Sequence, residues 1–415
     1  MRDWYPMTPV RARHAYRPPV KPSAVRLSPF VYWRRRAIVL LSVVTIVVLG
    51  YLGITLGLAL TNPSYGFSFQ ARFAEWGRQH GLGREITWAE TQYYRLNRPK
   101  TGGAPPLSAF GTGPTVFKIP SGVHLPAPTR IPTPAATALP GEGVWHIIGR
   151  ETANGTPTTY EAFVRPNALN TSYVVGVVWM DPKLLQAQLY SGSSIPGGGP
   201  YPYTAPVSVK SSRTLVDAFN AGFLMADANG GYYTDGKMIM PLRVGAASAV
   251  IFKDGSMTVG KWGRDVKMSN QVASVRQNLD LIVDNGKPVA GLTNANLAKW
   301  GLTLGGAFNV WRSGLGVTSD GALIYVGGPS LSISDLANVL VRAGAVRGME
   351  LDINTDWVSF SSFTGPLNTP VTGNNGTSLL SGMLETPAHY FASWWTRDFF
   401  TMSLRSAATT TVARG

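Results

Sequence analysis

The sequence predicts an α+β domain, a strand-rich mixed sheet with a few helices, preceded by one transmembrane helix. Three observations support this fold class. From about Val144 onward, strand-like runs alternate with Asp-Gly, Asn-Gly and Gly-Gly turns. Only two stretches of that region have apolar residues at helical spacing. Before it, residues 37–60 are apolar and carry no charge.

The uncharged segment 37–60 predicts the transmembrane helix. It exceeds the roughly twenty residues that a helix needs to cross a bilayer, whereas the apolar part of a cleaved signal peptide has about 7–15 residues. The basic sequence WRRR (33–36) precedes it directly. By the positive-inside rule we expect a single-pass protein of the cell membrane, with its N-terminus in the cytoplasm and residues 61–415 outside.

Basic residues are concentrated in the N-terminal tail. The net charge is +15, and residues 1–36 contain nine Lys and Arg residues against Asp3 alone. We interpret this tail as a disordered cytoplasmic segment that sets the topology and contacts anionic lipid, and we expect no nucleic acid partner. The chain has no cysteine, which excludes disulfides, thiolate metal sites and cysteine nucleophiles.

Two segments separate the membrane helix from the domain. In the juxtamembrane segment 61–98, Phe69, Phe73 and Trp76 recur at helical spacing. They predict a short amphipathic helix that packs on the domain or lies at the membrane surface. In residues 99–143 Pro and Gly recur without apolar periodicity, which predicts a semi-extended spacer. The domain itself is expected over 144–405.

Strands dominate the predicted domain. Their clearest turns are KDG (253–255), DNG (284–286) and SDG (319–321). The spacing of apolar residues predicts helices over 211–222 and over 332–345, the second with Ser332 as its N-cap.

Residues 348–360, GMELDINTDWVSF, contain an unusual density of acidic side chains. On a strand, Glu350, Asp352 and Asn354 would face one side, with Asp356 next in line. Clustered carboxylates repel one another and raise each other's pKa, so this acidic edge requires an explanation.

Three interpretations of the acidic edge stay open from the residues alone. Asp352 is a catalytic carboxylate with Glu350 or Asp356 as its partner. Alternatively, Asp352, Asn354 and Asp356 bind a hard cation, Ca²⁺ or Mg²⁺, although Trp357 and Phe363 stand where a standard EF-hand has Gly and Glu. The third interpretation is a solvated edge, or one paired with basic residues nearby, namely Arg342 and Arg347.

Several segments occur in an order that resembles the phosphodiester glycosidase family, to which the mannose 6-phosphate uncovering enzyme belongs. The resemblance covers roughly residues 145–400. It is carried by MDPKLLQAQLYSGSSIPGG (180–198), FNAGF (219–223), DG (235–236), QNLDLIVDNGKPV (277–289), WRSGLGVTSDGALIYV (311–326) and LSISDLANVLVRAGAVRGMELD (331–352). The anchor, the Pro-rich spacer and the RDFF sequence (397–400) resemble a membrane-anchored actinobacterial branch of that family.

The resemblance implies a hydrolase that cleaves the bond between the anomeric carbon of a sugar and a phosphodiester oxygen. It places Asp352 at the anomeric centre and Arg312 at the phosphate, with Asn220, Gly222 and Asp235 as further substrate-binding residues. The expected substrate is a sugar 1-phosphodiester in an envelope glycan or glycolipid. Alternative structural roles are an arginine bracing two loops for Arg312, a helix C-cap for Asn220 and a hairpin turn for Asp235.

The sequence departs from the family pattern directly after Asp352. Where the family has glycines and a serine, this chain has Ile353, Asn354, Thr355 and Asp356. Glycine-rich loops let backbone N–H groups approach a phosphate closely. The alternative function is therefore a catalytically inactive module on the same fold that binds envelope glycan.

Overall fold

The computed structural model describes residues 28–62, 65–96, 100–111, 122–192, 195–197, 199–293, 299–301, 309–392 and 397–406. The predicted basic tail up to residue 27, and residues 112–121 of the predicted spacer, lie outside these ranges. The chain divides into two compact units, Met1–Gly57 and Leu58–Gly415.

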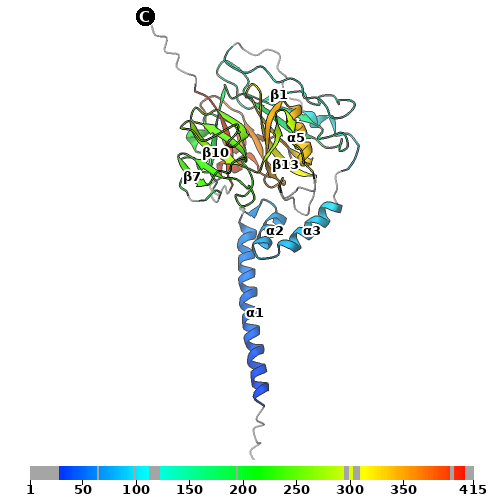
Figure 1. Ribbon diagram of the computed structural model, residues 1–415, viewed down its shortest axis with the longest axis vertical. Helices are drawn as coiled ribbons and strands as arrows, with labels where there is room; N and C mark the ends of the chain where they lie inside the picture. Colours follow the sequence, from blue (N-terminus) through cyan, green and yellow to red (C-terminus); the bar gives the residue numbers. More distant parts are fainter. Residues whose placement is uncertain are drawn as a thin grey trace, which may run out of the picture. The chain divides into compact units, whose positions relative to one another are not determined.

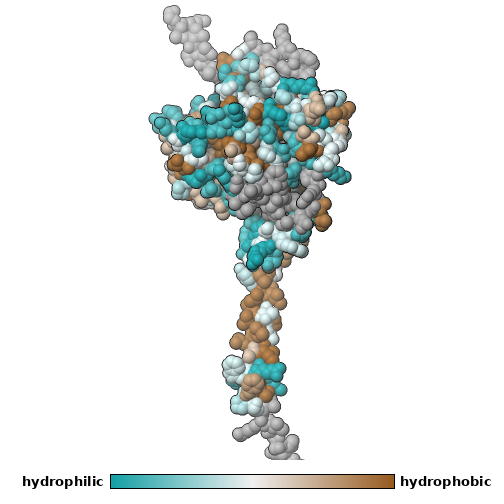
Figure 2. Space-filling view, turned by 45° about the vertical axis from the view of Figure 1, so that its right-hand side comes forward, coloured by the Kyte–Doolittle hydropathy of each residue, from teal (hydrophilic) through white to brown (hydrophobic). Residues whose placement is uncertain are grey.

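Helix α1 (Pro29–Thr61) contains the predicted membrane segment and is long and apolar enough to cross a membrane. Figure 2 shows hydrophobic residues, in brown, along most of its length and hydrophilic residues, in teal, at its N-terminal end. A signal sequence near the N-terminus can meet the same criteria of length and composition. The helix begins eight residues before the predicted segment, at Pro29, because proline suits the first helical position and the basic residues that follow favour a helix.

The juxtamembrane segment forms two helices, α2 (Phe69–Gln79) and α3 (Gly83–Leu96), which contact each other. Ser68 caps α2, because its Oγ accepts a hydrogen bond from the Ala71 N–H at 3.1 Å. The break between the helices includes Gly81, whose φ of +86° is readily available to glycine.

Within the described ranges the strands form three sheets, in which all neighbouring strands are antiparallel. The eight-stranded sheet consists, in spatial order, of β1 (His146–Ile148), β2 (Thr159–Val164), β3 (Val175–Met180), β14 (Leu323–Leu331), β13 (Val310–Thr318), β15 (Ala345–Ile353), β11 (Leu281–Asp284) and β12 (Lys287–Pro288). One five-stranded sheet consists of β7 (Lys237–Met240), β6 (Tyr232–Thr234), β10 (Val272–Gln277), β8 (Ala247–Phe252) and β9 (Met257–Lys261). The other consists of β17 (Gly376–Ser378), β16 (Phe360–Phe363), β5 (Leu215–Asn220), β18 (Phe399–Leu404) and β4 (Leu185–Tyr190). The predicted strand-rich α+β class is confirmed.

The second predicted helix is present. Helix α5 (Ile333–Arg342) begins after Ser332, whose Oγ accepts a hydrogen bond from the Asp335 N–H at 3.0 Å. The Asp335 carboxylate accepts in return from the Ser332 N–H, which completes a capping box. The helix contacts β13, β14 and β15 (Figure 1). Its buried residues Leu336, Val339 and Leu340 belong to a core cluster between the helix and this sheet.

The predicted helix over 211–222 is wrong. Only one helical turn, α4 (Val209–Ser212), precedes strand β5, which lies in the middle of its sheet between β16 and β18. All six residues of β5 are buried. A short apolar run that is buried on both faces does not show strand alternation, so periodicity alone cannot separate it from a helix. The interpretation of Asn220 as a helix C-cap is therefore also wrong.

Residues of the predicted spacer pack on the domain before Val144. Leu125 and Ile131 are buried in the cluster on the α5 side of the eight-stranded sheet. The Glu142 carboxylate is buried and accepts a hydrogen bond from the Arg165 Nη2 at 2.7 Å. It also accepts from the Leu139 N–H at 3.0 Å. Two short 3₁₀ helices, η5 (Gly373–Asn375) and η6 (Pro387–Phe391), lie near the C-terminal end, and η2 (Leu107–Phe110) precedes the domain.

Strand β5 buries one acidic side chain, Asp217, which accepts a hydrogen bond from the Thr159 hydroxyl at 2.7 Å. Burial raises the pKa of Asp217 from 3.8 to about 8. Between these pH values the folded chain holds a proton that the unfolded chain has lost, so this group makes stability fall as pH rises. In the parent protein we expect this group to lower the urea midpoint as the pH rises from about 4 to about 8. In Asp217→Asn we expect a smaller decrease over the same range.

The matched control for this prediction is Glu151→Gln, since Glu151 is exposed. The control should keep the pH profile of the parent protein. An Asp217→Asn protein with that same profile would show that Asp217 does not titrate between the two states.

Candidate functional site

Strand β15 carries the first half of the acidic edge. Glu350 and Asp352 lie on one face of the strand. Met349 and Leu351 lie on the other face and belong to a hydrophobic core cluster different from the one that contains the α5 residues. The strand ends at Ile353, and the next residue has a φ of +85°. The alternation therefore stops before Asn354 and Asp356, and the prediction of one line of four polar residues is wrong.

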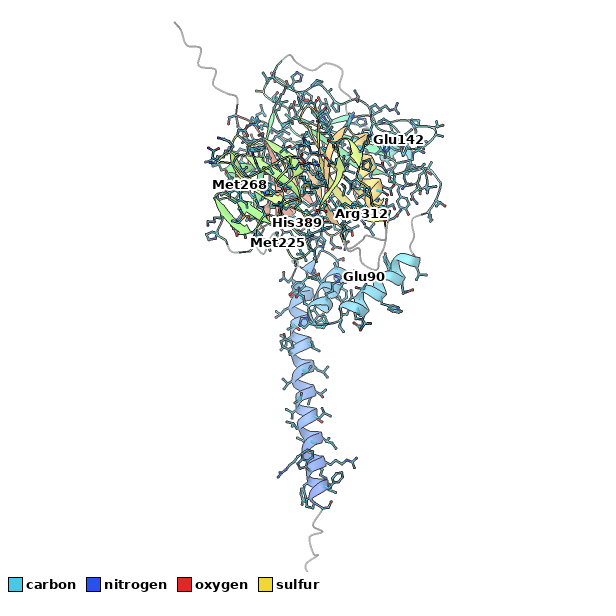
Figure 3. All side chains as sticks on the ribbon, viewed as in Figure 1. Glu90, Glu142, Met225, Met268, Arg312 and His389 are labelled. Atoms are coloured by element: carbon cyan, nitrogen blue, oxygen red, sulfur yellow. The ribbon has the colours of Figure 1, made fainter. Side chains whose placement is uncertain are left out.

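Glu350 forms a buried ion pair with Arg312 of β13. Neither side chain is exposed, and the Arg312 Nη1 donates to the Glu350 Oε1. The Arg312 Nε also donates to the carbonyl of Leu331, at the end of β14, at 3.1 Å. Burial raises the pKa of Glu350, although the Arg312 charge opposes that effect. Figure 3 shows Arg312 among the strands of the domain. Its guanidinium joins β15 to the end of β14, whereas the alternative structural role has the arginine bracing two loops.

Asp352 is held by Arg397 at the end of β15. The Arg397 Nη1 donates to the Asp352 Oδ2 at 2.8 Å, and the Ile353 N–H donates to the Oδ1 at 2.7 Å. The guanidinium carbon of Arg397 lies 3.4 Å from the ring centre of Trp357, a cation–π contact. Burial raises the pKa of Asp352 to about 6, which Arg397 limits by favouring the carboxylate.

The acidic edge is therefore neither solvated nor paired with Arg342 and Arg347. Glu350, Asp352 and Asp356 are each at most 3% exposed. Arg342 donates to backbone carbonyls, including that of Pro132 at 2.9 Å. The Arg347 Nε lies 3.7 Å from the Asp265 Oδ2.

The structure adds Glu385, which the sequence analysis did not find. Its Oε2 accepts a hydrogen bond from the Ser359 hydroxyl, which in turn accepts from the Tyr390 hydroxyl at 3.1 Å. Burial raises the pKa of Glu385 to about 8, the Arg397 charge lowers it, and the charge of Asp352 raises it further. Glu385 therefore shares an electrostatic environment with Asp352. No motif surrounds it in the sequence, so only the folded arrangement reveals it.

Asn220 joins three elements through its side-chain amide. The Nδ2 donates to the Ser313 hydroxyl at 3.0 Å, and the Oδ1 accepts from the Tyr325 hydroxyl and the Ser359 N–H, both at 3.1 Å. The Ser313 hydroxyl also accepts from the Asp352 N–H at 3.1 Å. Through Ser313, Asn220 thus supports the backbone that carries Asp352.

Gly222 lies against a second buried arginine. A side-chain carbon at this position would be 3.2 Å from the guanidinium of Arg276. That guanidinium donates from its Nε to the Asp398 Oδ2 at 2.7 Å, and both side chains are fully buried. Gly222 therefore gives Arg276 the room it needs, which is a structural reason for a small residue there.

Asp235 lies at a different place. It occupies the exposed two-residue turn between β6 and β7, has a φ of +48° and accepts a hydrogen bond from the Thr234 hydroxyl at 2.9 Å. In the described part of the chain, no hydrogen bond or ion pair joins its side chain to Asp352, Arg312 or Asn220. Asp235 therefore lies in a hairpin turn, as its alternative structural role predicts.

Asp356 binds the start of α2. Its Oδ1 accepts from the backbone N–H groups of Phe67 and Ser68, at 2.7 and 2.8 Å. The ring of Phe67 meets Trp357 edge-on, with 5.9 Å between ring centres. The third carboxylate of the acidic edge thus connects the domain to its juxtamembrane helices.

The predicted cation ligands have other partners. Asp352 accepts from Arg397, Asp356 from Phe67 and Ser68, and the Asn354 Oδ1 from the Thr355 hydroxyl and, at 3.3 Å, the Asp356 N–H. Within the described ranges, no group of three or more His, Asp or Glu side chains is arranged to hold a metal ion. Ca²⁺ or Mg²⁺ binding by Asp352, Asn354 and Asp356 stays a prediction.

No protein-family model matches the chain. No curated protein matches it either. Among solved structures, it is similar to the catalytic domain of zebrafish N-acetylglucosamine-1-phosphodiester alpha-N-acetylglucosaminidase, auto-inhibited by its pro-peptide, with 12% identity, a TM-score of 0.38, and coverage of 62% of this chain and 87% of that one. A hypothetical protein from Synechocystis shares 14% identity at a TM-score of 0.33, over 61% of this chain and 63% of that one. A putative exported protein from Burkholderia pseudomallei shares 12% identity at a TM-score of 0.28, over 56% and 74%.

The Arg312–Glu350 pair makes a prediction about stability. Removing one partner leaves an unpaired buried charge, so we expect Arg312→Ala and Glu350→Ala each to lower the free energy of unfolding by about 3–5 kcal/mol. Urea denaturation of the detergent-solubilised protein measures this. The double variant Arg312→Met/Glu350→Leu should recover most of the loss. If the double variant lost as much unfolding free energy as the two single variants together, that result would contradict the ion pair.

The contact between Asp356 and α2 makes a second prediction. In Asp356→Ala, the N–H groups of Phe67 and Ser68 lose a charged acceptor, and we expect the local opening free energy there to fall by about 1–3 kcal/mol. Hydrogen exchange of residues 67–71 measures it, with Asp235→Ala as a control carboxylate in an exposed turn. Unchanged protection in Asp356→Ala would count against the contact.

Proposed function

We propose that the chain is a membrane-anchored hydrolase that acts outside the cytoplasm on the glycosidic bond of sugar 1-phosphodiesters in envelope glycans or glycolipids. The observation that carries the proposal is the grouping of Asp352, Arg397 and Trp357. A carboxylate, a guanidinium and an indole are the groups that recognition of an anomeric centre, a phosphate and a sugar ring requires. The ordered segments that resemble the phosphodiester glycosidase family support the same chemistry. The anchor, the Pro-rich spacer and the RDFF sequence (397–400) are what favour its membrane-anchored actinobacterial branch.

In this proposal Asp352 acts at the anomeric carbon. The leaving group is a phosphate monoester, which departs readily, so the main demand is to stabilise or attack an oxocarbenium-like centre. A pKa of about 6 leaves the Asp352 carboxyl mainly ionised at neutral pH, as this role requires. A pKa of about 8 leaves Glu385 mainly protonated, as a proton donor requires.

We assign the phosphate contact to Arg397 instead of Arg312. Arg312 is fully buried and its charge is matched by Glu350. The Arg397 side chain is 11% exposed and is paired with Asp352, the carboxylate assigned to the anomeric carbon. A partly exposed guanidinium next to that carboxylate suits a phosphodiester oxygen. Arg312, Asn220 and Gly222 then act as positioning residues for β15 and Arg276.

The membrane location in this proposal follows from α1. Its length and composition suit a transmembrane span, and Arg34, Arg35 and Arg36 lie near its N-terminal end. The positive-inside rule then directs the domain away from the cytoplasm.

The competing proposal is a module that binds envelope glycan without cleaving it. Two observations favour it: Asp352 and Glu385 are only 3% and 2% exposed, and the glycine-rich loop of the family is absent. A buried carboxylate that keeps its arginine partner would have a structural role alone.

Hydrolysis is tested with the full chain in detergent micelles and a panel of sugar 1-phosphodiesters, with and without Ca²⁺ or Mg²⁺, by measuring free reducing sugar. We expect turnover that falls by about 10²-fold or more in Asp352→Asn and Glu385→Gln. In Arg397→Ala we expect the KM for the phosphodiester to rise. Glu151→Gln, an exposed carboxylate, is the control and should keep full activity.

The two proposals differ in whether the protein releases sugar from the substrates that it binds. Glycan binding without release of sugar from any substrate would favour the binding module. Full turnover in both Asp352→Asn and Glu385→Gln would remove these carboxylates from the chemistry.

A further inference from the structure

The juxtamembrane helices α2 and α3 carry several large apolar side chains that are exposed. Phe69 and Phe73, four residues apart on α2, are 64% and 38% exposed. On α3, Trp88 and Leu96 are 67% and 85% exposed. Tyr93 is also exposed. Four of these five residues are aromatic, and we call the set the aromatic face of α2–α3. Stable water-facing helices rarely carry so many large apolar groups together.

The aromatic face belongs to a well-packed pair of helices. Trp76 and Ile86 are buried, and a side-chain carbon on Gly77 would lie 3.1 Å from Ile86. The guanidinium of Arg78 on α2 donates to both oxygens of Glu90 on α3, each at 2.8 Å. The inner side of the pair thus has its own apolar and ionic contacts. Of the exposed side chains, Phe73 also contacts Trp76, with 6.0 Å between the ring centres.

The start of α2 is bonded to the end of α1. The Arg72 Nη1 donates to the carbonyl of Leu60 at 2.8 Å, and the Nε donates to the carbonyl of Gly66 at 2.8 Å. Leu60 belongs to the last turn of α1, where C-terminal carbonyls have no partner within the helix. This bond fixes the first turn of α2 at the end of the apolar helix.

We propose that the aromatic face of α2–α3 lies in the interface of a phospholipid bilayer, between the headgroups and the acyl chains. This inference rests on the proposed membrane anchoring by α1. Tryptophan and tyrosine are enriched at that depth, because an apolar ring with a polar edge suits it. Amphipathic helices bind there by burying one apolar face. The bond from Arg72 to Leu60 places α2 at the boundary where α1 leaves the apolar layer.

The inference is tested in the full-length protein reconstituted into phosphatidylcholine–phosphatidylglycerol vesicles. Because the chain has no cysteine, single substitutions give unique labelling sites. An environment-sensitive fluorophore is attached to Phe73→Cys and to Trp88→Cys. The matched control is Val244→Cys, an exposed apolar residue of the domain. Ile46→Cys, within α1, reports on the anchor itself.

Emission is measured in vesicles with and without phosphatidylcholine that carries a nitroxide at acyl carbon 5. We expect the labels at positions 73 and 88 to be quenched several-fold more strongly than the label at position 244. Quenching at position 46 with none at positions 73 and 88 would overturn this inference and leave the anchor intact. No quenching at position 46 would overturn the anchor, and the inference with it. Blue-shifted emission at positions 73 and 88 without nitroxide quenching would show that protein, such as a second copy, covers the face.

Discussion

The buried ion pair between Arg312 and Glu350 is the interaction on which the candidate site most depends. Removing two ions from water costs several kcal/mol each, so neither charge is tolerated without the other. The pair lies where β13 and β15 are neighbours, with Gly314 opposite Glu350 and Arg312 opposite Ile353 across an irregular register. Keeping the two charges together therefore favours this register. The same register sets the end of β15, where Asp352 lies.

Residues 397 and 398 extend this charge matching to all three sheets. Arg397 binds Asp352 at the end of β15, in the eight-stranded sheet. Asp398 binds Arg276 of β10, in one five-stranded sheet. The next residue, Phe399, begins β18 in the other. Two adjacent residues of opposite charge thus join three sheets, and each ion finds a partner from a different one. Because each charge has a partner of opposite sign, the chain can bury Arg276, Asp352 and Asp398 close to the start of β18.

How much the sequence could predict depends on how local each signal is. The uncharged run in α1, the Ser332 cap of α5 and the turns at 253–255, 284–286 and 319–321 are local, and the structure has a helix or a turn at each. Glu350 and Asp352 were recognised from strand alternation, which is also local. Strand β5 was mistaken for a helix because burial on both faces removes the alternation. The partners of the acidic edge could not be predicted, since Arg397 is 45 residues from Asp352 and Asp398 is 122 residues from Arg276.

The hydrogen bond from Arg72 to the carbonyl of Leu60 has a consequence for how the domain would meet its targets. Only residues 62–68 separate α1 from α2, and Asp356 of the domain accepts hydrogen bonds from the N–H groups of Phe67 and Ser68. With the proposed anchor in a bilayer, the domain then has only this short connection to extend. Its search is then confined to a thin layer and proceeds by lateral diffusion. In such a layer the encounter rate is set by the number of target molecules per unit area of membrane, and hardly by their concentration in the surrounding solution.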